Sequence, residues 1–259
     1  MSTSESQPLE ENIEIANGLV AAASKIVVLT GAGISTDSGL PDFRGPNGIW
    51  TKNPEAEKAS TISNYVNEPS VRKANWALRA EGKLWANVAP NDGHRALLPL
   101  QERGTLHTLV TQNVDELHQM AGIDPELVVE IHGTTRKAGC LSCDYLTTME
   151  AVLERVRAGE EDPECPNCGG IIKSATISFG QQLIAADLLR AQLAADEADL
   201  LMAIGSTLTV NPIASIVPRA VRNGADLVVV NAEPTPFDGV ANAVVRGSIS
   251  DVLSRIVGP

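Results

Sequence analysis

Short runs of apolar, mostly β-branched residues recur along this 259-residue chain, and helical stretches separate them. The runs lie at 25–30, 106–110, 127–131, 199–204 and 226–230, and the clearest helical patterns lie at 9–23, 182–197 and 212–223. Continuous apolar runs of this length are typical of strands that are buried on both faces of a parallel sheet. Strands that alternate with helices predict βαβ units, and therefore an α/β fold with a doubly wound, Rossmann-like parallel sheet.

The composition excludes several other classes of protein. Hydrophobic residues make up 43% of the chain, which is enough to form a substantial core. The 32 acidic and 20 basic residues give a net charge of −12, which argues against nucleic acid or an anionic membrane as the main partner. No apolar run approaches the ~18 residues that a membrane span requires, and the first residues do not resemble a secretory signal. We therefore expect a cytoplasmic protein.

Two CxxC pairs lie in a polar segment that interrupts the alternation of strands and helices. Cys140 and Cys143 form the first pair, and Cys165 and Cys168 follow after 21 intervening residues. Four thiolates match the tetrahedral preference of zinc, and a closed set of four sulfurs leaves no position for catalysis. Disulfides are disfavoured inside cells, and a redox CxxC motif would not explain the second pair. The spacing therefore predicts one structural Zn²⁺ ion per chain.

A glycine-rich loop follows the first apolar run. Gly31 and Gly33 match the first two glycines of GxGxxG, whereas Thr36 occupies the third position. Such a loop can bring a diphosphate close to backbone N–H groups, although about half of such matches are only tight turns. The acidic residue that dehydrogenases carry about 20 residues further on is missing. The loop therefore favours phosphate binding in a protein other than an ordinary dehydrogenase.

Polar side chains follow several of the predicted strands. The positions are Gln112, Asn113 and Asp115 after the second run, His132 after the third, Gly205 and Ser206 after the fourth, and Asn231 and Glu233 after the fifth. Ligands of doubly wound sheets bind at the carboxyl ends of the strands, so these residues are candidates for a binding crevice. For single positions a helix N-cap or a structural histidine remains the alternative.

These residues, taken in order, resemble the sirtuin family of NAD-dependent protein deacylases. The resemblance extends from about residue 25 to about residue 257 and rests on the following motifs: Gly31-Ala-Gly-Ile-Ser35, Gly39-Leu-Pro-Asp-Phe-Arg44, Thr111-Gln-Asn-Val-Asp115, Leu117-His118, His132-Gly133, both CxxC pairs, Phe179-Gly180, Gly205-Ser206, and Asn231 with Glu233. It implies a Rossmann-like domain from residues 1–44, 93–133 and 174–259. A helical insert with a cofactor loop (45–92) and a zinc-ribbon module (134–173) would form a smaller lobe.

The resemblance also implies roles for individual residues. NAD would be a co-substrate bound by Gly31, Ala32, Gly33, Ser35, Asp42, Phe43, Arg44, Gln112, Asn113, Asp115, Gly205, Ser206, Asn231, Glu233, Ser248 and Ile249. His132 would be the general base, with Asn113 and Asp115 beside it in the catalytic site. The acyl group of a protein lysine would be transferred to ADP-ribose, with release of nicotinamide.

The acylated lysine would lie against Ile177, Phe179 and Gly180, with the peptide pairing as an extra strand. Relatives that remove succinyl groups carry a Tyr-x-x-Arg pair, whose place is taken here by Trp76 and Arg79. Since one donor of the pair is changed, we expect acetyl to be preferred over succinyl. The alternative is that Trp76 belongs to the core, as most tryptophans do.

Three other functions remain open at this point. A mono-ADP-ribosyltransferase could use the same scaffold, and an NAD-sensing zinc module could bind partners without catalysis. The presence of both Asn113 and His132 argues against a pure binding module, which needs no base. An NAD oxidoreductase is a more distant alternative, because the loop lacks the dehydrogenase acid.

Overall fold

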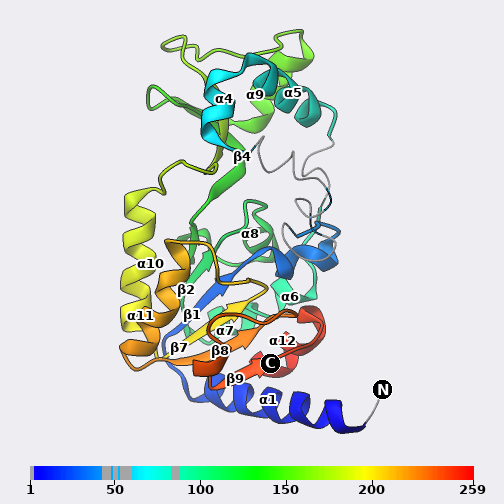
Figure 1. Cartoon of the computed structure of the whole chain (residues 1–259), viewed down its shortest axis with the longest axis vertical. Helices are drawn as coiled ribbons and strands as arrows, with labels where there is room; N and C mark the ends of the chain where they lie inside the picture. The colour runs from blue at the N-terminus through cyan, green and yellow to red at the C-terminus, as the bar shows by residue number, and fades with distance from the viewer. Residues whose placement is uncertain (1–2, 43–47, 49–51, 53–59, 83–87) are drawn as a thin grey trace.

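A six-stranded parallel sheet forms the centre of the larger domain in this computed structural model, which describes residues 3–42, 48, 52, 60–82 and 88–259 (Figure 1). In spatial order its strands are β3 (Val128–Glu130), β2 (Leu106–Thr111), β1 (Ile26–Thr30), β7 (Leu200–Ile204), β8 (Asp226–Val230) and β9 (Ala243–Val245). Counted along the chain this is the order 3-2-1-4-5-6 of doubly wound nucleotide-binding sheets. All strands are parallel, and the order in which they are added to the sheet reverses between β1 and β7.

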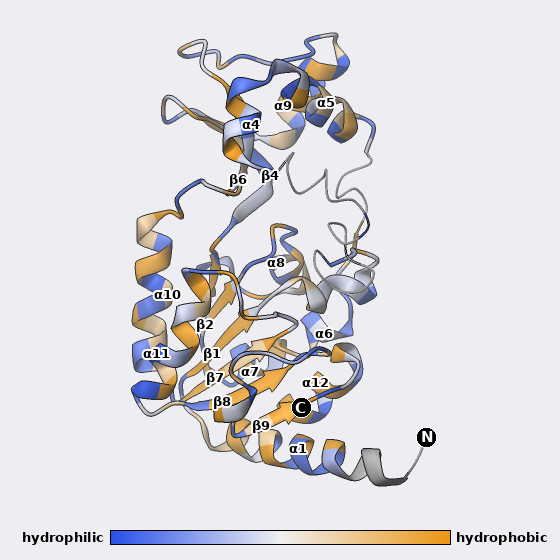
Figure 2. Ribbon diagram, in the orientation of Figure 1, coloured by the Kyte–Doolittle hydropathy of each residue, from blue (hydrophilic) through white to orange (hydrophobic). Residues whose placement is uncertain are grey.

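Strand β1 is buried on both faces, as its apolar run predicts. Ile26 and Val28 point into one hydrophobic core, whereas Val27 and Leu29 point into a second core on the opposite face of the sheet. This division follows from the two-residue period of side chains along a strand. The central strands are accordingly hydrophobic along their length (Figure 2).

Helices cover both faces of this sheet (Figure 1). The helices that pack on the first core are α1 (Thr3–Ala22), α6 (Asp92–Arg95), α7 (Leu98–Glu102) and α12 (Ile249–Val257). The second core is covered by α10 (Ala185–Glu197) and α11 (Ile216–Arg222). Short helices complete the connections: η1 (Ala32–Ser38), α8 (Leu117–Ala121), η2 (Pro125–Leu127), η3 (Ile213–Ser215) and η4 (Asp238–Val240). The doubly wound α/β fold predicted from the sequence is confirmed.

The helical insert and the cysteine segment form one smaller lobe. Its antiparallel sheet contains β5 (Leu146–Thr148), β4 (Gly133–Cys140) and β6 (Ile172–Thr176), and its helices are α4 (Ile62–Asn67), α5 (Pro69–Ala80) and α9 (Met149–Arg157). Trp76 of α5 packs with Ala138 of β4 and Val152 of α9 in a shared core. The helical insert and the cysteine segment therefore stabilise each other, while the division of domains by residue number stays a prediction.

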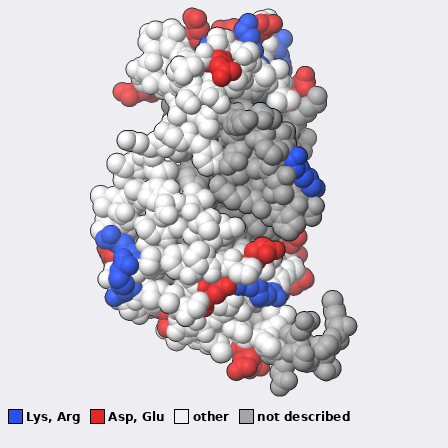
Figure 3. All heavy atoms as spheres, viewed as in Figure 1, with Lys and Arg blue, Asp and Glu red and all other residues white. Residues whose placement is uncertain are grey.

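Some local details differ from the sequence-based expectations. The glycine-rich loop continues into the 3₁₀ helix η1, and the helix expected over 212–223 begins as η3 and becomes α-helical at Ile216. Strand β9 was not expected, because Ala243–Val245 lies between Asn242 and Arg246 and so belongs to no longer apolar run. None of the described helices combines the length and apolarity needed to cross a bilayer. Charges of both signs occur on the face shown in Figure 3.

Candidate active site and metal site

Two glycine loops meet at the carboxyl ends of β1 and β7, where the strand order reverses. The N–H of Gly33 donates to the carbonyl oxygen of Gly205 at 2.9 Å, and the N–H of Gly31 donates to Ile204 at 3.0 Å. A Cβ atom on Gly33 would lie 2.7 Å from the Cα of Gly205, and Gly205 itself has φ of +63°. These glycines therefore have a packing role, and the N–H groups of Gly31 and Gly33 are already engaged within the protein.

The Ser35 hydroxyl group lies at the centre of a buried polar network. It donates to Oδ2 of Asp115 at 2.8 Å and accepts a hydrogen bond from Nδ2 of Asn113 at 3.1 Å. Asn113 also donates to the carbonyl oxygen of Gly31 at 3.2 Å. The end of β2 is therefore bound to the glycine loop that follows β1. The adjacent pocket is lined by Ala32, Ser35, Leu40, Pro41, Asn113, Val114 and Asp115.

Asp115 is buried, and burial raises its pKa, although the N–H of Leu117 and the hydroxyl group of Ser35 oppose that shift by donating to its carboxylate. A buried carboxylate with two donors is oriented rather than mobile. It can accept a hydrogen bond from a ligand amide in the adjacent pocket. The side chain is therefore suited to holding a carboxamide.

Gln112 connects three strand ends. Its side-chain Nε2 donates to Oγ of Ser206 at 2.8 Å, and its carbonyl oxygen lies 2.9 Å from Nδ1 of His132. A carbonyl oxygen only accepts, so Nδ1 of His132 carries the proton and the lone pair lies on Nε2. The half-buried imidazole thus has the tautomer that a general base at Nε2 requires.

Four of the remaining candidate cofactor residues follow β8 and β9, and the other three follow η1. Asn231 is buried, and its Nδ2 donates to the carbonyl oxygen of Glu233, whose own side chain is exposed. Ser248 and Ile249 lie at the start of α12. Asp42 is half-buried, whereas Phe43 and Arg44 lie outside the described residues. The structure thus places the described candidates at the carboxyl ends of the strands, as the doubly wound fold predicts.

The candidate substrate residues follow β6, where the small lobe meets the larger domain. The N–H of Ile177 donates to the carbonyl oxygen of His132 at 2.7 Å. Phe179 pairs with Thr61 in a parallel bridge, so the helical insert also reaches this segment. Phe179 is partly exposed, and Gly180 has φ of +78°, which favours glycine. The candidate base and the candidate peptide groove are therefore directly connected.

Trp76 does not line a substrate pocket in this structure. Its side chain is fully buried in the core of the small lobe, and its Nε1 has no hydrogen-bond partner among the described residues. This placement corrects the expectation of substrate contact and supports the alternative that Trp76 is a core residue. Arg79, one turn further along α5, is half-buried and donates to Asn75 at 2.9 Å and to Ser174 at 3.3 Å.

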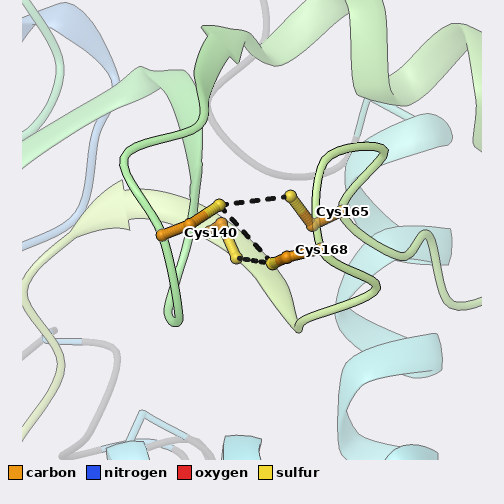
Figure 4. A group of neighbouring side chains, drawn as sticks. Cys140, Cys165 and Cys168 are labelled. Atoms are coloured by element: carbon orange, nitrogen blue, oxygen red, sulfur yellow. Dashed lines mark hydrogen bonds between the residues drawn. The ribbon is translucent and has the colours of Figure 1, made fainter.

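The four cysteine sulfurs of the small lobe converge on one point (Figure 4). All four lie within 4.8 Å of one another, and the closest pairs are 3.5–3.6 Å apart. Tetrahedral zinc with Zn–S bonds of 2.3 Å requires sulfur–sulfur distances of about 3.8 Å, so the donor set and its geometry fit this ion. A Cβ atom on Gly170 would lie 3.0 Å from Sγ of Cys140, so a side chain at position 170 would crowd this sulfur.

One buried residue beside the candidate site was missed by the sequence analysis. His94 is fully buried, and its Nε2 lies 3.4 Å from Oγ of Ser35. Its signal in the sequence is the Asn91-x-x-His94 spacing, because Asn is a favourable N-cap and a residue three positions later can close a capping box.

The fold and site define a Rossmann-like α/β protein that carries a four-thiol metal-binding lobe. The chain matches the Sir2 family over residues 31–212, and it belongs to that family. NAD-dependent protein deacetylase 2 of Streptomyces coelicolor is 44% identical over 232 residues, which cover 90% of this chain and 96% of that protein.

Solved structures agree with this assignment. A structure described as the structural basis for the mechanism and regulation of Sir2 enzymes has a TM-score of 0.84 and 36% identity, with 96% of this chain and 97% of that chain covered. A Sir2 structure with a p53 peptide and NAD⁺ has a TM-score of 0.80 and 32% identity, with 92% of this chain and 94% of that chain covered.

Proposed function

We propose that this chain is an NAD-dependent protein-lysine deacetylase. It transfers the acyl group of an acylated lysine to ADP-ribose, releases nicotinamide and leaves a free lysine, and one water molecule is consumed. The observation that carries this proposal is the 2.9 Å hydrogen bond between Nδ1 of His132 and the carbonyl oxygen of Gln112. It orients a candidate base beside Asn113, at the strand ends where a doubly wound sheet binds its ligand.

NAD, when bound, supplies an electrophilic ribose carbon and a leaving group that needs no acid. The residues of the chain then have to bind and orient NAD and to remove the proton of a ribose hydroxyl group. The Asp115 carboxylate holds the carboxamide of nicotinamide, and Asn113 and Gln112 orient the ribose. His132 would accept, at Nε2, the proton of a ribose hydroxyl group, and NAD would supply that hydroxyl group as the acceptor of the acyl group.

The cofactor extends along the strand ends. Ala32, Ser35 and the glycines of their loop surround the diphosphate, with Asp42 beyond them, and the proposal assigns Phe43 and Arg44, which lie outside the described residues, to the same cofactor. The adenosine portion is held by Gly205, Ser206, Asn231, Glu233, Ser248 and Ile249. Because the N–H of Gly33 donates to Gly205, Gly33 contributes by letting the two loops approach rather than by donating to phosphate.

The acylated lysine enters beside Ile177, Phe179 and Gly180, and its peptide pairs with this segment as an added strand. The hydrogen bond from Ile177 to the carbonyl oxygen of His132 supports this arrangement, since it ties the groove to the base. The partner is therefore a protein that carries acylated lysine, and we place the enzyme in the cytoplasm.

Cys140, Cys143, Cys165 and Cys168 hold one structural Zn²⁺ ion. Four sulfur ligands leave no open position, so the ion stabilises the small lobe and takes no part in the transfer. A lobe of this size needs such a cross-link because its own core is small.

Mass spectrometry of an acetylated peptide, incubated with the protein with and without NAD, tests the proposal. The expected result is NAD-dependent loss of the acetyl group, with nicotinamide and O-acetyl-ADP-ribose as the other products. ADP-ribose added to the peptide or to the protein, without loss of acetyl, would indicate a mono-ADP-ribosyltransferase instead. NAD binding with no change in the peptide would indicate a binding module.

A further inference from the structure

An ion pair next to the proposed adenosine site is used by no step of the proposed mechanism. Arg246 follows β9, and its Nη2 donates to the carboxylate of Asp238 in η4. The two side chains are only 32% and 26% exposed. Nη1 of Arg246 donates to the backbone carbonyl oxygen of Asn231 at 2.7 Å. The pair thus reaches the first residue after β8, which is one of the residues proposed to hold adenosine.

Both backbone groups of Asn231 are bonded to the end of β9. Its N–H donates to the carbonyl oxygen of Val245 at 3.3 Å, and its carbonyl oxygen accepts the hydrogen bond from Arg246. Val245 is the last residue of β9, so Arg246 extends the contact between the two strands by one residue. The backbone orientation of Asn231 therefore depends on Arg246.

The side chain of Asn231 is oriented as well. Its Nδ2 donates to the carbonyl oxygen of Glu233 at 2.7 Å. Because a carbonyl oxygen only accepts, the amide nitrogen faces Glu233 and Oδ1 is turned away from it. The residue is buried, yet Oδ1 has no hydrogen-bond partner among the described residues. An acceptor held in this way is suited to a hydroxyl group of a ligand, such as those of the adenosine ribose.

Asp238 holds Arg246 in its position. In addition to the guanidinium group, its carboxylate accepts hydrogen bonds from the N–H of Thr235 at 3.1 Å and from the hydroxyl group of Thr235 at 2.6 Å. Thr235 is itself buried. A carboxylate with three donors is firmly oriented, and its charge neutralises that of Arg246. Arg246 is therefore engaged within the protein and is not free to bind a phosphate group of the cofactor.

We propose that Arg246 and Asp238 are positioning residues, which orient Asn231 through its backbone so that Oδ1 faces the adenosine portion of NAD. The inference rests on the proposed function for its effect on cofactor binding. Its effect on the segment 231–238 can be measured on the protein alone.

Hydrogen exchange of the protein without NAD tests the structural part of the inference. We expect the amides of residues 231–238 to exchange about threefold to tenfold faster in Arg246→Gln and in Asp238→Asn than in the wild-type protein, because each substitution removes a hydrogen bond that holds this segment. Exchange in β1 and β7 should not change. Wild-type exchange of residues 231–238 in both variants would overturn the inference, whatever the protein's activity.

A double-mutant cycle on the Kd for NAD tests the functional part. Arg246→Gln and Asp238→Asn should each raise this Kd about threefold to tenfold. The double variant should bind NAD no more weakly than either single variant, because the two side chains act as one unit. If Arg246 bound a cofactor phosphate directly, Asp238→Asn would release its charge and lower the Kd. A lower Kd in Asp238→Asn, or additive effects in the double variant, would overturn the positioning role.

Steady-state kinetics distinguish positioning from general damage to the fold. The KM for NAD should rise in both variants, with little change in kcat or in the KM for acetyl-peptide. A fall in kcat with equal effects on the KM values of both substrates would overturn the positioning role.

The pair of Arg219 and Asp196 is the matched control. Its side chains are 39% and 29% exposed, and it joins α11 to α10 at a point in the chain before β8, whereas Asn231 follows β8. Arg219→Gln should leave the Kd for NAD unchanged. A rise in Kd as large as that in Arg246→Gln would mean that the loss of any such ion pair suffices, and it would overturn the inference. A wild-type protein that removes no acetyl group would instead contradict the proposed function, while hydrogen exchange would still decide the inference.

Discussion

The imidazole of His132 is held by the backbone of Gln112, through a hydrogen bond of 2.9 Å from Nδ1 to the carbonyl oxygen. The side chain of Gln112 in turn donates to Ser206 at the end of β7. Gln112, the first residue after β2, therefore fixes the tautomer of the candidate base and connects the base with β7, on the far side of β1. Such rigid placement matters because general-base catalysis depends on geometry before it depends on pKa.

Replacement of Cys165 with serine should remove the metal and destabilise the small lobe. Cys165 is buried and also belongs to the core of that lobe, so its loss affects both the ligand set and the packing. We expect metal analysis to give about one zinc per wild-type chain and well under half of that in Cys165→Ser. Ser142→Ala is the control, since it changes a neighbour of Cys140 but no ligand. A wild-type protein with far less than one zinc per chain would rule out the structural site.

Arg72 and Asp162 join the helical insert to the cysteine segment, 90 residues apart in sequence. Both Nε and Nη2 of Arg72 donate to the carboxylate, at 2.8–3.0 Å, and the two side chains are only 11% and 24% exposed. Arg72→Ala leaves a half-buried carboxylate without its partner, and we expect a loss of about 1–3 kcal/mol of unfolding free energy in urea titrations. Lys73→Ala breaks the neighbouring but exposed pair with Glu161 and should have a much smaller effect, because solvent screens that pair. Equal effects of the two substitutions would contradict this assignment.

Glu130, the last residue of β3, should make stability depend on pH. Burial, and then the charge of Glu116, raise its pKa from 4.5 to about 7, and its Oε1 has no hydrogen-bond partner among the described residues. Between pH 4.5 and pH 7 the folded state therefore binds more protons than the unfolded state. The contribution of Glu130 to the unfolding free energy consequently falls as the pH rises. Since the carboxyl group is partly exposed, we expect the loss to be about 1–2 kcal/mol.

Glu130→Gln retains the shape of the protonated acid and removes the titration. Urea unfolding should show a larger gain in stability from this substitution at pH 8 than at pH 5.5. The same difference between variant and wild type at both pH values would show that Glu130 titrates normally.

Acetyl-lysine should be a better substrate than succinyl-lysine. The side chain of Trp76 is fully buried and turned into the core, so only Arg79 of the pair remains to hold a distal carboxylate. A buried carboxylate that lacks one partner costs about 1–3 kcal/mol, or roughly fivefold to 150-fold in kcat/KM. Matched acetyl and succinyl peptides measure this ratio directly. A succinyl value equal to or above the acetyl value would show that Arg79 and its neighbours suffice for an anionic acyl group.

The sequence was sufficient to predict the sheet but not all of its details. The five long apolar runs became β1, β2, β3, β7 and β8, because burial on both faces leaves a continuous pattern. Strand β9 leaves no such pattern, because its three residues lie between the polar residues Asn242 and Arg246. The role of Trp76 in the core depends on contacts with Ala138 and Val152, far along the chain, which no local pattern contains. The involvement of His94 likewise depends on a contact with Ser35 across 59 residues.

The same limit applies to the candidate site. Motif order was enough to identify the family, and strand ends located the polar residues, because both depend on local sequence. The engagement of the Gly33 N–H by Gly205 depends on how closely two loops pack, which the glycines alone do not specify. The individual cofactor and substrate contacts stay predictions.

The central claim, that His132 is the base of an NAD-dependent acyl transfer, is tested by comparing nicotinamide release and acetyl-peptide loss in wild-type protein and in His132→Tyr. The wild-type protein should release one nicotinamide for each acetyl group removed. His132→Tyr should bind NAD with nearly unchanged affinity but turn over at least about 100-fold more slowly. Turnover close to that of the wild type in His132→Tyr would contradict the account, and His132 would then be a structural residue of the strand end.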